Sequence, residues 1–403
     1  MDTEQIANRL ADLRRALRAA GHDALLVPRA DEYLGEYLPR HNERLLWLTG
    51  FTGSAGLAVV FPDRAALFVD GRYTVQVRKQ VPPELFEFHH LADEPPIAWL
   101  ARQLNPGARV AADPRLHAAN WYGEANRILS GVGAELVALP HNPVDECWLD
   151  RPPPLIAPAL LLPADRSGES SVDKRARVGA ELAARGADAA LVFAPDSISW
   201  LLNVRGTDVP RMPVLQSLGL LYADGSLTLM VDPGRVPDGF DAHVGAGVTV
   251  VDERDAAEVL AGVGRRTVLF DPAGSSAWCE QLLERAGSTL IAGDDPVLVP
   301  KACKNTVELE GARAAHRRDG AAKSRFLAWL DAELVSGRRH DEAALAGRLL
   351  AFRQQDELFR DLSFDTISAA GANAAMCHYN HLDGEPATLP VDGVYLVDSG
   401  AQY

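Results

Sequence analysis

The chain has 403 residues, 47% of them hydrophobic and 24% charged, so it can bury globular cores and is expected to form two or three domains. Its formal net charge of -15 argues against nucleic acid and anionic membranes as partners, and no stretch approaches the ~18 consecutive apolar residues of a membrane span. The four cysteines are scattered with no C-x-x-C pair, and the N-terminus lacks a signal-peptide core, which together predict reduced thiols and a cytoplasmic protein.

The first segment has the pattern of a helix followed by a strand. Apolar residues recur at spacings of 4, 3 and 4 from Ile6 to Leu17, which places them on one helical face, and Gly21 is suited to the C-cap. Residues 22–28 then read as a strand. A Trp-bearing apolar segment over residues 45–50 and a hairpin over residues 56–72 follow.

The same order of predicted elements recurs in the middle of the chain. Residues 174–186 are helix-like, residues 187–193 read as a strand, and a Trp-bearing segment and a hairpin over residues 219–235 come after them. The offset between matching landmarks shrinks along the chain, as loop deletions in a duplicated domain would produce. The landmark pairs are Asp23 and Asp188 (165 apart), Asp113 and Asp271 (158 apart), and Pro143 and Pro296 (153 apart). Chance similarity in an Ala- and Val-rich sequence explains these ordered landmarks less well, so we expect two related α/β domains with mixed sheets.

Composition places the domain boundaries. We expect the first domain over residues 1–150 and its duplicate over residues 151–300, with the Pro-rich stretch at residues 151–154 as the linker. Residues 301–403 form a third region. It shows two helices and two strands whose hydrophobic faces need partners that this sequence does not contain, so we expect the third domain to be incomplete here.

The third region opens with a predicted long helix. Asn305 and Glu308 form an approximate capping pair, apolar positions from Phe326 to Leu334 mark a buried face, and Gly337 is suited to end the helix. Residues 340–357 read as a second helix. Residues 364–370 read as a strand.

The last apolar run carries the most informative carboxylate. Val394–Val397 predicts a buried strand that delivers Asp398 onto a Ser-Gly turn. That position suits a hard-oxygen metal ligand or an acid–base group, although a single carboxylate cannot hold a divalent ion. A turn carboxylate that accepts the backbone N–H groups of Ser399 and Gly400 is the alternative.

Two histidines precede this strand. His378 is either a functional histidine or a satisfied, partly buried one, and its residue type alone leaves both interpretations open. His381 gives an H-x-x-H spacing with it, but the stretch that follows reads as a loop, and we do not include His381 among the candidate ligands.

Taken together, the motifs resemble the Xaa-Pro aminopeptidases (aminopeptidase P), in the long three-domain form, within the creatinase-like, pita-bread metallopeptidases. The resemblance covers essentially the whole chain. The motifs on which it rests are L-T-G-F-T-G-S-A-G from Leu48, D-G-R-Y from Asp70, K-N-T-V-E from Lys304, S-F-D-T-I-S-x-x-G-x-N-A-A-x-x-H-Y from Ser363 and Y-L-V-D-S-G-A-Q-Y from Tyr395. It implies an α/β protein with two related creatinase-type N-terminal mixed-sheet domains, followed by an incomplete α+β pita-bread catalytic domain.

The resemblance also implies an activity and a cofactor. Such enzymes release the N-terminal residue from peptides with proline in second position, by a water or hydroxide shared between two divalent metals, usually manganese. Of the implied ligands Asp, Asp, His, Glu and Glu, only the first, Asp398, matches inside this chain. His378 matches the catalytic histidine that hydrogen-bonds the substrate or transition state. Because the other four ligands are expected beyond residue 403, this chain by itself is expected to bind metal weakly and to be inactive.

Three interpretations of function follow. The leading one is an Xaa-Pro aminopeptidase that acts on Xaa-Pro peptides and, as its family implies, forms a homodimer. The alternative is a non-catalytic creatinase-like binding protein or pseudoenzyme. A dipeptide-cleaving prolidase or a creatinase is disfavoured by two N-terminal domains of creatinase type where one would be expected.

Overall fold

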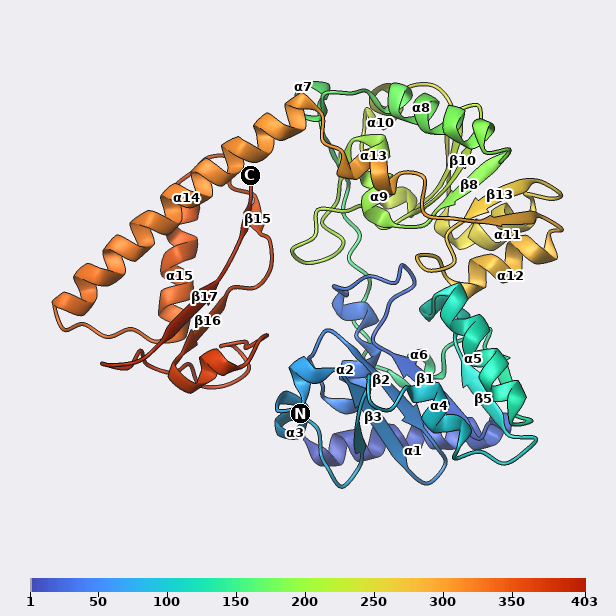
Figure 1. The fold of residues 1–403 in the computed structure, drawn as a ribbon, viewed down its shortest axis with the longest axis horizontal. Coiled ribbons are helices and arrows are strands. Elements are labelled where there is room, and N and C mark those ends of the chain that lie inside the picture. The colour runs from blue at the N-terminus through green and yellow to red at the C-terminus, as the bar shows by residue number, and fades with distance from the viewer. Residues whose placement is uncertain (1) are drawn as a thin grey trace. The chain divides into compact units, whose positions relative to one another are not determined.

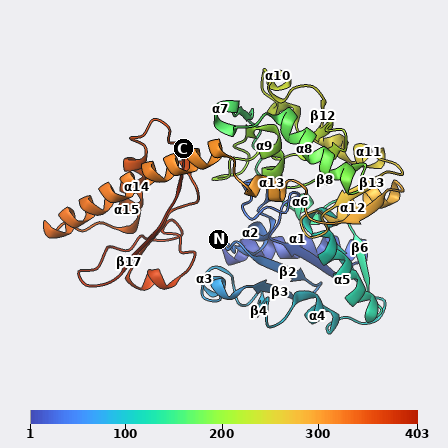
Figure 2. The same ribbon diagram turned by 45° about the horizontal axis from the view of Figure 1, so that its top comes forward.

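A computed structural model describes residues 2–403 of the protein (Figures 1 and 2). The chain divides into two compact units. The first runs through Ala164 and continues over Glu169–Cys303, and the second combines Asp165–Gly168 with Lys304–Tyr403. No helix among the described residues is long and apolar enough to cross a membrane.

The first unit contains two six-stranded mixed sheets with the same topology. The strand orders are β4-β3-β2-β1-β5-β6 and β12-β11-β10-β8-β13-β14. The first sheet comprises β1 (Ala24–Pro28), β2 (Gly56–Val60), β3 (Ala65–Val69), β4 (Glu87–His90), β5 (Arg109–Ala112) and β6 (Glu135–Ala138). The second comprises β8 (Ala189–Val192), β10 (Leu218–Tyr222), β11 (Leu227–Met230), β12 (Val248–Val251), β13 (Thr267–Phe270) and β14 (Thr289–Ala292).

Strand directions match as well as strand order. In the first sheet β1 runs antiparallel to β2 and parallel to β5, and in the second β8 runs antiparallel to β10 and parallel to β13. The remaining pairings also correspond one to one. The duplication expected from the sequence landmarks is therefore confirmed.

Helices of 5 to 18 residues connect and cover the two sheets. Those of the first half are α1 (Thr3–Ala20), α2 (Arg44–Thr49), α3 (Gln76–Gln80), α4 (Pro96–Ala101), α5 (Ala119–Gly131) and α6 (Pro143–Cys147). Those of the second half are α8 (Ser171–Ala184), α9 (Pro195–Leu202), α10 (Phe240–Val244), α11 (Ala256–Ala261), α12 (Ala277–Arg285) and α13 (Leu298–Ala302). A two-stranded pair, β7 (Leu160–Leu161) and β9 (Val204–Arg205), lies in the same half, and α7 (Ala164–Ser167) spans the change from the first unit to the second.

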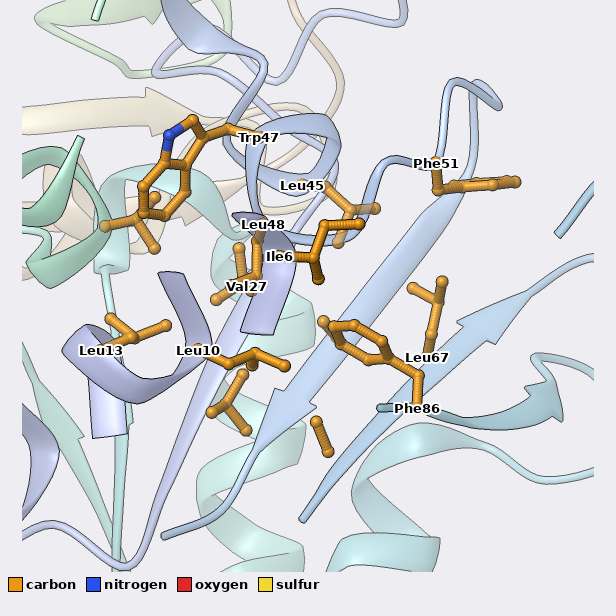
Figure 3. Close-up of a cluster of buried hydrophobic side chains, with 14 of the residues drawn as sticks. Ile6, Leu10, Leu13, Val27, Leu45, Trp47, Leu48, Phe51, Leu67 and Phe86 are labelled. Carbon is orange, nitrogen blue, oxygen red and sulfur yellow. The ribbon is translucent and has the colours of Figure 1, made fainter. Parts of the chain in front are cut away.

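Helix α1 shows why the local sequence folds as predicted. Asp2 accepts the Glu4 N–H at the N-cap, and Gly21 ends the helix in the left-handed region at φ 68°, which glycine adopts without steric cost. The predicted apolar face from Ile6 to Leu17 is buried against the sheet in a cluster with Trp47 (Figure 3). Each such side chain contributes about 1.5–3 kcal/mol of hydrophobic stabilisation.

A matching polar pair precedes the central strand of each sheet. The Asp23 carboxylate accepts the Arg109 N–H, and the Asp23 N–H donates to the Arg109 carbonyl, both at 2.8 Å. Asp188 exchanges the same two bonds with Thr267, also at 2.8 Å. The duplication thus extends from topology to individual hydrogen bonds.

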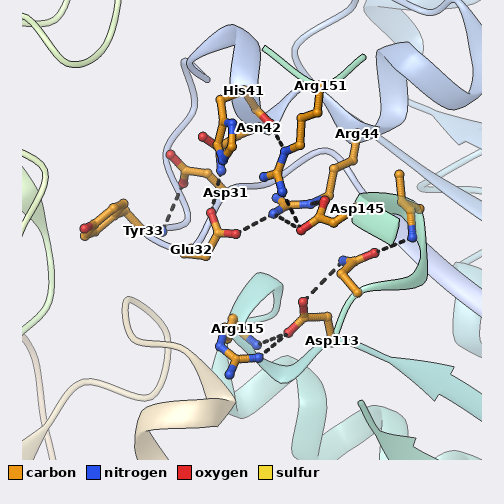
Figure 4. Close-up of polar contacts among 12 residues, drawn as sticks. Asp31, Glu32, Tyr33, His41, Asn42, Arg44, Asp113, Arg115, Asp145 and Arg151 are labelled. Carbon is orange, nitrogen blue, oxygen red and sulfur yellow. Dashed lines mark hydrogen bonds and ion pairs between the residues drawn. The ribbon is translucent and has the colours of Figure 1, made fainter. Parts of the chain in front are cut away.

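Asp145 joins a buried arginine to the start of the linker (Figure 4). Arg44 is 1% exposed and forms two hydrogen bonds with Asp145, at 2.7 and 2.9 Å, and a further ion pair with Glu32. Arg151, at the start of the Pro-rich linker, pairs with the same Asp145 at 2.8 Å and donates to the His41 carbonyl. A paired, forked contact of this kind fixes geometry as well as charge.

The second unit is a pair of helices with two short two-stranded sheets, β15-β18 and β16-β17 (Figure 1). Its elements are α14 (Thr306–Val335), α15 (Glu342–Arg353), β15 (Asp361–Leu362), β16 (Ile367–Ala370), β17 (Tyr395–Asp398) and β18 (Ala401–Gln402). The predicted capping box of Asn305 and Glu308 is present in full, and Gly337 has a φ of 81° just after the long helix. Phe326 and Leu330 face the core, as expected.

Two details of the predicted elements were wrong. The second helix is shorter than the predicted 340–357, and β16 begins three residues later than the predicted residue 364. The expectation of a buried final strand was also wrong, because Val394 and Leu396 are 64% and 37% exposed. Strand β17 pairs with β16 in a two-stranded sheet, and an apolar strand is buried only where a second layer covers it.

Candidate functional site

Asp398 is the last residue of β17 and lies opposite Ile367 of β16. Its side chain is exposed, and within residues 2–403 its carboxylate accepts no hydrogen bond and forms no ion pair. The alternative of a turn carboxylate that accepts the N–H groups of Ser399 and Gly400 therefore has no support. An exposed, unpartnered carboxylate is a suitable hard-oxygen donor for a divalent cation.

The residue after Asp398 is anchored from the second unit's helices. The Ser399 hydroxyl accepts a hydrogen bond from Arg353 and lies 3.0 Å from the Thr366 hydroxyl. Arg353, only 1% exposed, donates from Nε and one terminal nitrogen to the two carboxylate oxygens of Asp319, at 2.7 and 3.1 Å. The guanidinium thus links α14, α15 and the end of β17.

His378 lies on the connection between β16 and β17. The short 3-10 helix Gly371–Ala375 begins this connection, and His378 follows in a turn with its side chain exposed. The exposed imidazole could reach a bound molecule. His378 is more exposed than the interpretation as a satisfied, partly buried histidine expects.

A buried carboxylate organises this connection. Glu342 is fully buried and accepts four hydrogen bonds. The donors are the Ala370 N–H (2.7 Å) and the Asn373 side chain (3.0 Å) on one oxygen, and the Tyr379 hydroxyl (2.7 Å) and the Ala387 N–H (2.9 Å) on the other. Burial acts to raise the pKa of Glu342, but these hydrogen bonds outweigh it and hold its pKa below the ordinary value. The Glu342 carboxylate is therefore ionised at neutral pH.

Sequence reasoning missed Glu342 and Arg353. Both stand in a predicted helix with nothing in their spacing to mark them. Two partners of Glu342, Asn373 and Tyr379, belong to the motif that carries the resemblance. Because the sequence analysis assigned no role to these two residues, they were the one sequence signal that could have pointed to Glu342.

His381 remains outside the candidate set. Its side chain is 8% exposed, and its Nδ1 has no hydrogen-bond partner within the described residues.

The two predicted site residues are not brought into contact. In the ladder of β16 and β17, Ala370 faces Tyr395 and Ile367 faces Asp398, so the connection that bears His378 leaves from the end of the ladder opposite to Asp398. Among residues 2–403, no group of three or more His, Cys, Asp or Glu side chains is arranged to hold a metal ion. Asp398 is suited to be one ligand of such a site.

Comparison with known proteins identifies the family. The Creatinase/Prolidase N-terminal domain profiles match residues 9–146 and 150–308, and the Metallopeptidase family M24 profile matches residues 310–403. A probable Xaa-Pro aminopeptidase P of Tuber melanosporum is 34% identical over 100% of this chain and 68% of its own length. The chain belongs to the Xaa-Pro aminopeptidase P family.

Two further members of the aminopeptidase P family support this assignment. Xaa-Pro aminopeptidase ApepP of Drosophila melanogaster is 34% identical over 100% of the chain and 67% of its own length. The X-prolyl aminopeptidase of Caenorhabditis elegans, described as a cytosolic enzyme with a di-nuclear active site, superposes with a TM-score of 0.92 at 30% identity, covering 99% of this chain and 68% of that one. The predicted fold class is thereby confirmed: two creatinase-type N-terminal domains and part of an M24 pita-bread domain. The chain spans about two thirds of the length of these relatives, 61% in the case of the Neurospora crassa protein.

Proposed function

We propose that this aminopeptidase P chain is part of an enzyme that releases the N-terminal residue from peptides with proline in second position. Family membership over the whole chain supports the reaction class. The structural observation that carries the proposal is the exposed, unpartnered carboxylate of Asp398 at the end of β17, where the resemblance expects a metal ligand.

The proposed cofactor is a pair of divalent metal ions, with manganese as the metal used. When bound, such a pair lowers the pKa of a shared water and polarises the substrate carbonyl. Asp398 would supply one carboxylate to it. Because divalent ions take several oxygen ligands, the proposal assigns the remaining ligands to sequence outside these 403 residues.

The proposed role of His378 is to donate a hydrogen bond from its exposed imidazole to the substrate or transition state. Its exposure on the connection between β16 and β17 supports this role. A donor of this kind that acts mainly in the transition state contributes about 10²–10³ in kcat.

The test compares the 403-residue chain with the full product of its gene in manganese titrations and in hydrolysis of Arg-Pro-Pro. In the full product, Asp398→Asn is expected to weaken manganese binding strongly, whereas His378→Gln should keep manganese binding and lower kcat by about 10²–10³. Asp392→Asn and His141→Gln change exposed residues of the same types and serve as controls.

Three outcomes would overturn the proposal. Manganese-dependent cleavage of Arg-Pro-Pro by residues 1–403 alone would refute the assignment of ligands outside this chain. A full gene product that binds no manganese and cleaves no Xaa-Pro peptide would favour the non-catalytic binding protein or pseudoenzyme. Cleavage of Xaa-Pro dipeptides but not of longer peptides would favour a prolidase.

We also propose a cytoplasmic homodimer. The scattered cysteines, all four of them free, and the cytosolic description of the Caenorhabditis elegans enzyme support the location. The family resemblance supports the dimer. Light scattering on the purified protein tests the dimer, and a monomer at micromolar concentration would contradict it.

A further inference from the structure

Helix α15 has a buried charged residue at each end. Glu342 is its first residue and Arg353 its last, and they are 0% and 1% exposed. The acid at the N-terminus and the base at the C-terminus both complement the helix dipole. Burying two charges is nevertheless costly unless each is hydrogen-bonded. The hydrogen-bond partners of Glu342 and Arg353 therefore identify the segments that the two residues hold in place.

The Glu342 end holds the connection that carries His378. One of its four donors is the N–H of Ala370, the last residue of β16, and the other three belong to Asn373, Tyr379 and Ala387 within that connection. The Asn373 side chain also donates to the Tyr379 hydroxyl at 3.0 Å, which closes a small network. Tyr379 directly follows His378. The backbone at His378 is therefore fixed although its imidazole is exposed.

The Arg353 end holds the strand that carries Asp398. Its guanidinium is fixed by the fork to Asp319 on α14 and donates to the Ser399 hydroxyl, directly after Asp398. The Thr366 hydroxyl meets the same Ser399 hydroxyl from the residue before Ile367, which is the partner of Asp398 in the ladder. Both contacts fall on Ser399, so the residue directly after Asp398 is restrained while the Asp398 carboxylate is left unpartnered.

We propose that Glu342 and Arg353 are positioning residues, and that α15 is the spacer that sets His378 and Asp398 at a fixed separation. The twelve residues of α15 span about 18 Å at 1.5 Å per residue. The functional meaning rests on the roles proposed above for His378 and Asp398. The placement of the two segments by α15 does not depend on those roles.

The test uses amide hydrogen exchange and the NMR resonances of the His378 ring in the 403-residue chain without metal. Glu342→Gln puts an amide NH₂ group among the N–H and O–H donors. It should speed exchange at Ala370 and Ala387 by about tenfold or more and displace the His378 ring signals. Tyr379→Phe removes one donor only and is the milder variant should Glu342→Gln fail to fold.

Arg353→Lys keeps the charge but loses the fork, and its effects should fall on the other segment. The Ser363 and Arg360 amides, which donate to the carbonyls of Gly400 and Gln402, should exchange faster, while the His378 ring signals stay in place. Leu349→Ala, in the buried core of the same helix, is the control. It should lower stability overall without favouring either segment.

Function gives a second readout in the full gene product. Arg353→Lys is expected to weaken manganese binding about 10-fold or more, whereas Glu342→Gln should leave manganese affinity unchanged and lower kcat. If each variant disturbs both segments equally, as is expected of Leu349→Ala, or disturbs neither, the positioning roles are refuted. A selective exchange pattern together with an absence of manganese binding would support the spacer role of α15 and refute the proposed metal function.

Discussion

Ala118 and Ser276 face each other in an antiparallel bridge that joins the two creatinase-type domains. Beside it, the Ala119 N–H donates to the Ser275 carbonyl and the Ala277 N–H donates to the His117 carbonyl, both at 2.9 Å. The facing residues are 158 positions apart, the same offset that separates Asp113 from Asp271. Equivalent positions of the two copies therefore bind each other, so the contact between the domains follows the duplication.

The first prediction concerns the two alanines beside this bridge. Ala119 packs into a core cluster formed mainly by the second domain, and Ala277 packs into one formed mainly by the first. Ala277→Leu should overfill that cluster and lower the free energy of unfolding by about 1–3 kcal/mol. Urea denaturation measures the loss. Ala273→Leu, at an exposed position nearby, should change little, and equal losses in the two variants would contradict the packing role.

The second prediction concerns the pH dependence of stability. Asp31 is 1% exposed and accepts hydrogen bonds from the N–H groups of Tyr33 and Gly35 and from the Gln216 side chain of the other domain. Burial raises the pKa of Asp31 from 3.8 to about 6 against the opposing effect of the Gly35 hydrogen bond. The folded state therefore binds a proton more tightly than the unfolded state. The resulting stabilisation is present below about pH 4 and is lost as the pH rises through about 6.

Asp31→Asn should remove this dependence, because the amide stays neutral. Relative to wild type, the variant should gain up to about 3 kcal/mol in unfolding free energy between pH 4 and pH 7, on the scale of 1.36 kcal/mol per pKa unit. Urea titrations of both proteins across this range measure the difference. A difference that stays constant with pH would show that Asp31 does not titrate in this range.

The third prediction concerns the backbone just after Asp398. A Cβ added at Gly400 would lie 2.8 Å from the Ser363 hydroxyl and 3.1 Å from the Ser363 Cβ. Gly400→Ala should therefore cost about 1–3 kcal/mol and loosen the Ser363 N–H to Gly400 carbonyl bond, now 3.0 Å. Gly384→Ala, where nothing lies within 4 Å, is the matched control. Adding Ser363→Gly should restore stability, and a failure to do so would place the strain elsewhere.

Much of the fold was predictable because its signals are local. The apolar spacing of α1, the hairpins and the capping box at Asn305 and Glu308 each lie within a few consecutive residues. The site was not predictable in this way. Arg353 and Ser399 are 46 residues apart, and no periodicity links them. The apolar strand before it singled out Asp398, but the family resemblance gave Asp398 and His378 their specific roles. The exposure of β17 follows from its place in a two-stranded sheet, which an apolar run does not reveal.

The polar pairs at Asp23 and Asp188 have a practical consequence. Asp23 accepts the Arg109 N–H and Asp188 accepts the Thr267 N–H, both at 2.8 Å and at equivalent positions of the two domains, but the surrounding residues differ. Asparagine substituted at either position removes one charge from a matched contact. The chain thus contains the same contact twice. The difference between the losses of unfolding free energy in the two variants measures how much the neighbouring residues change the contribution of a single hydrogen bond.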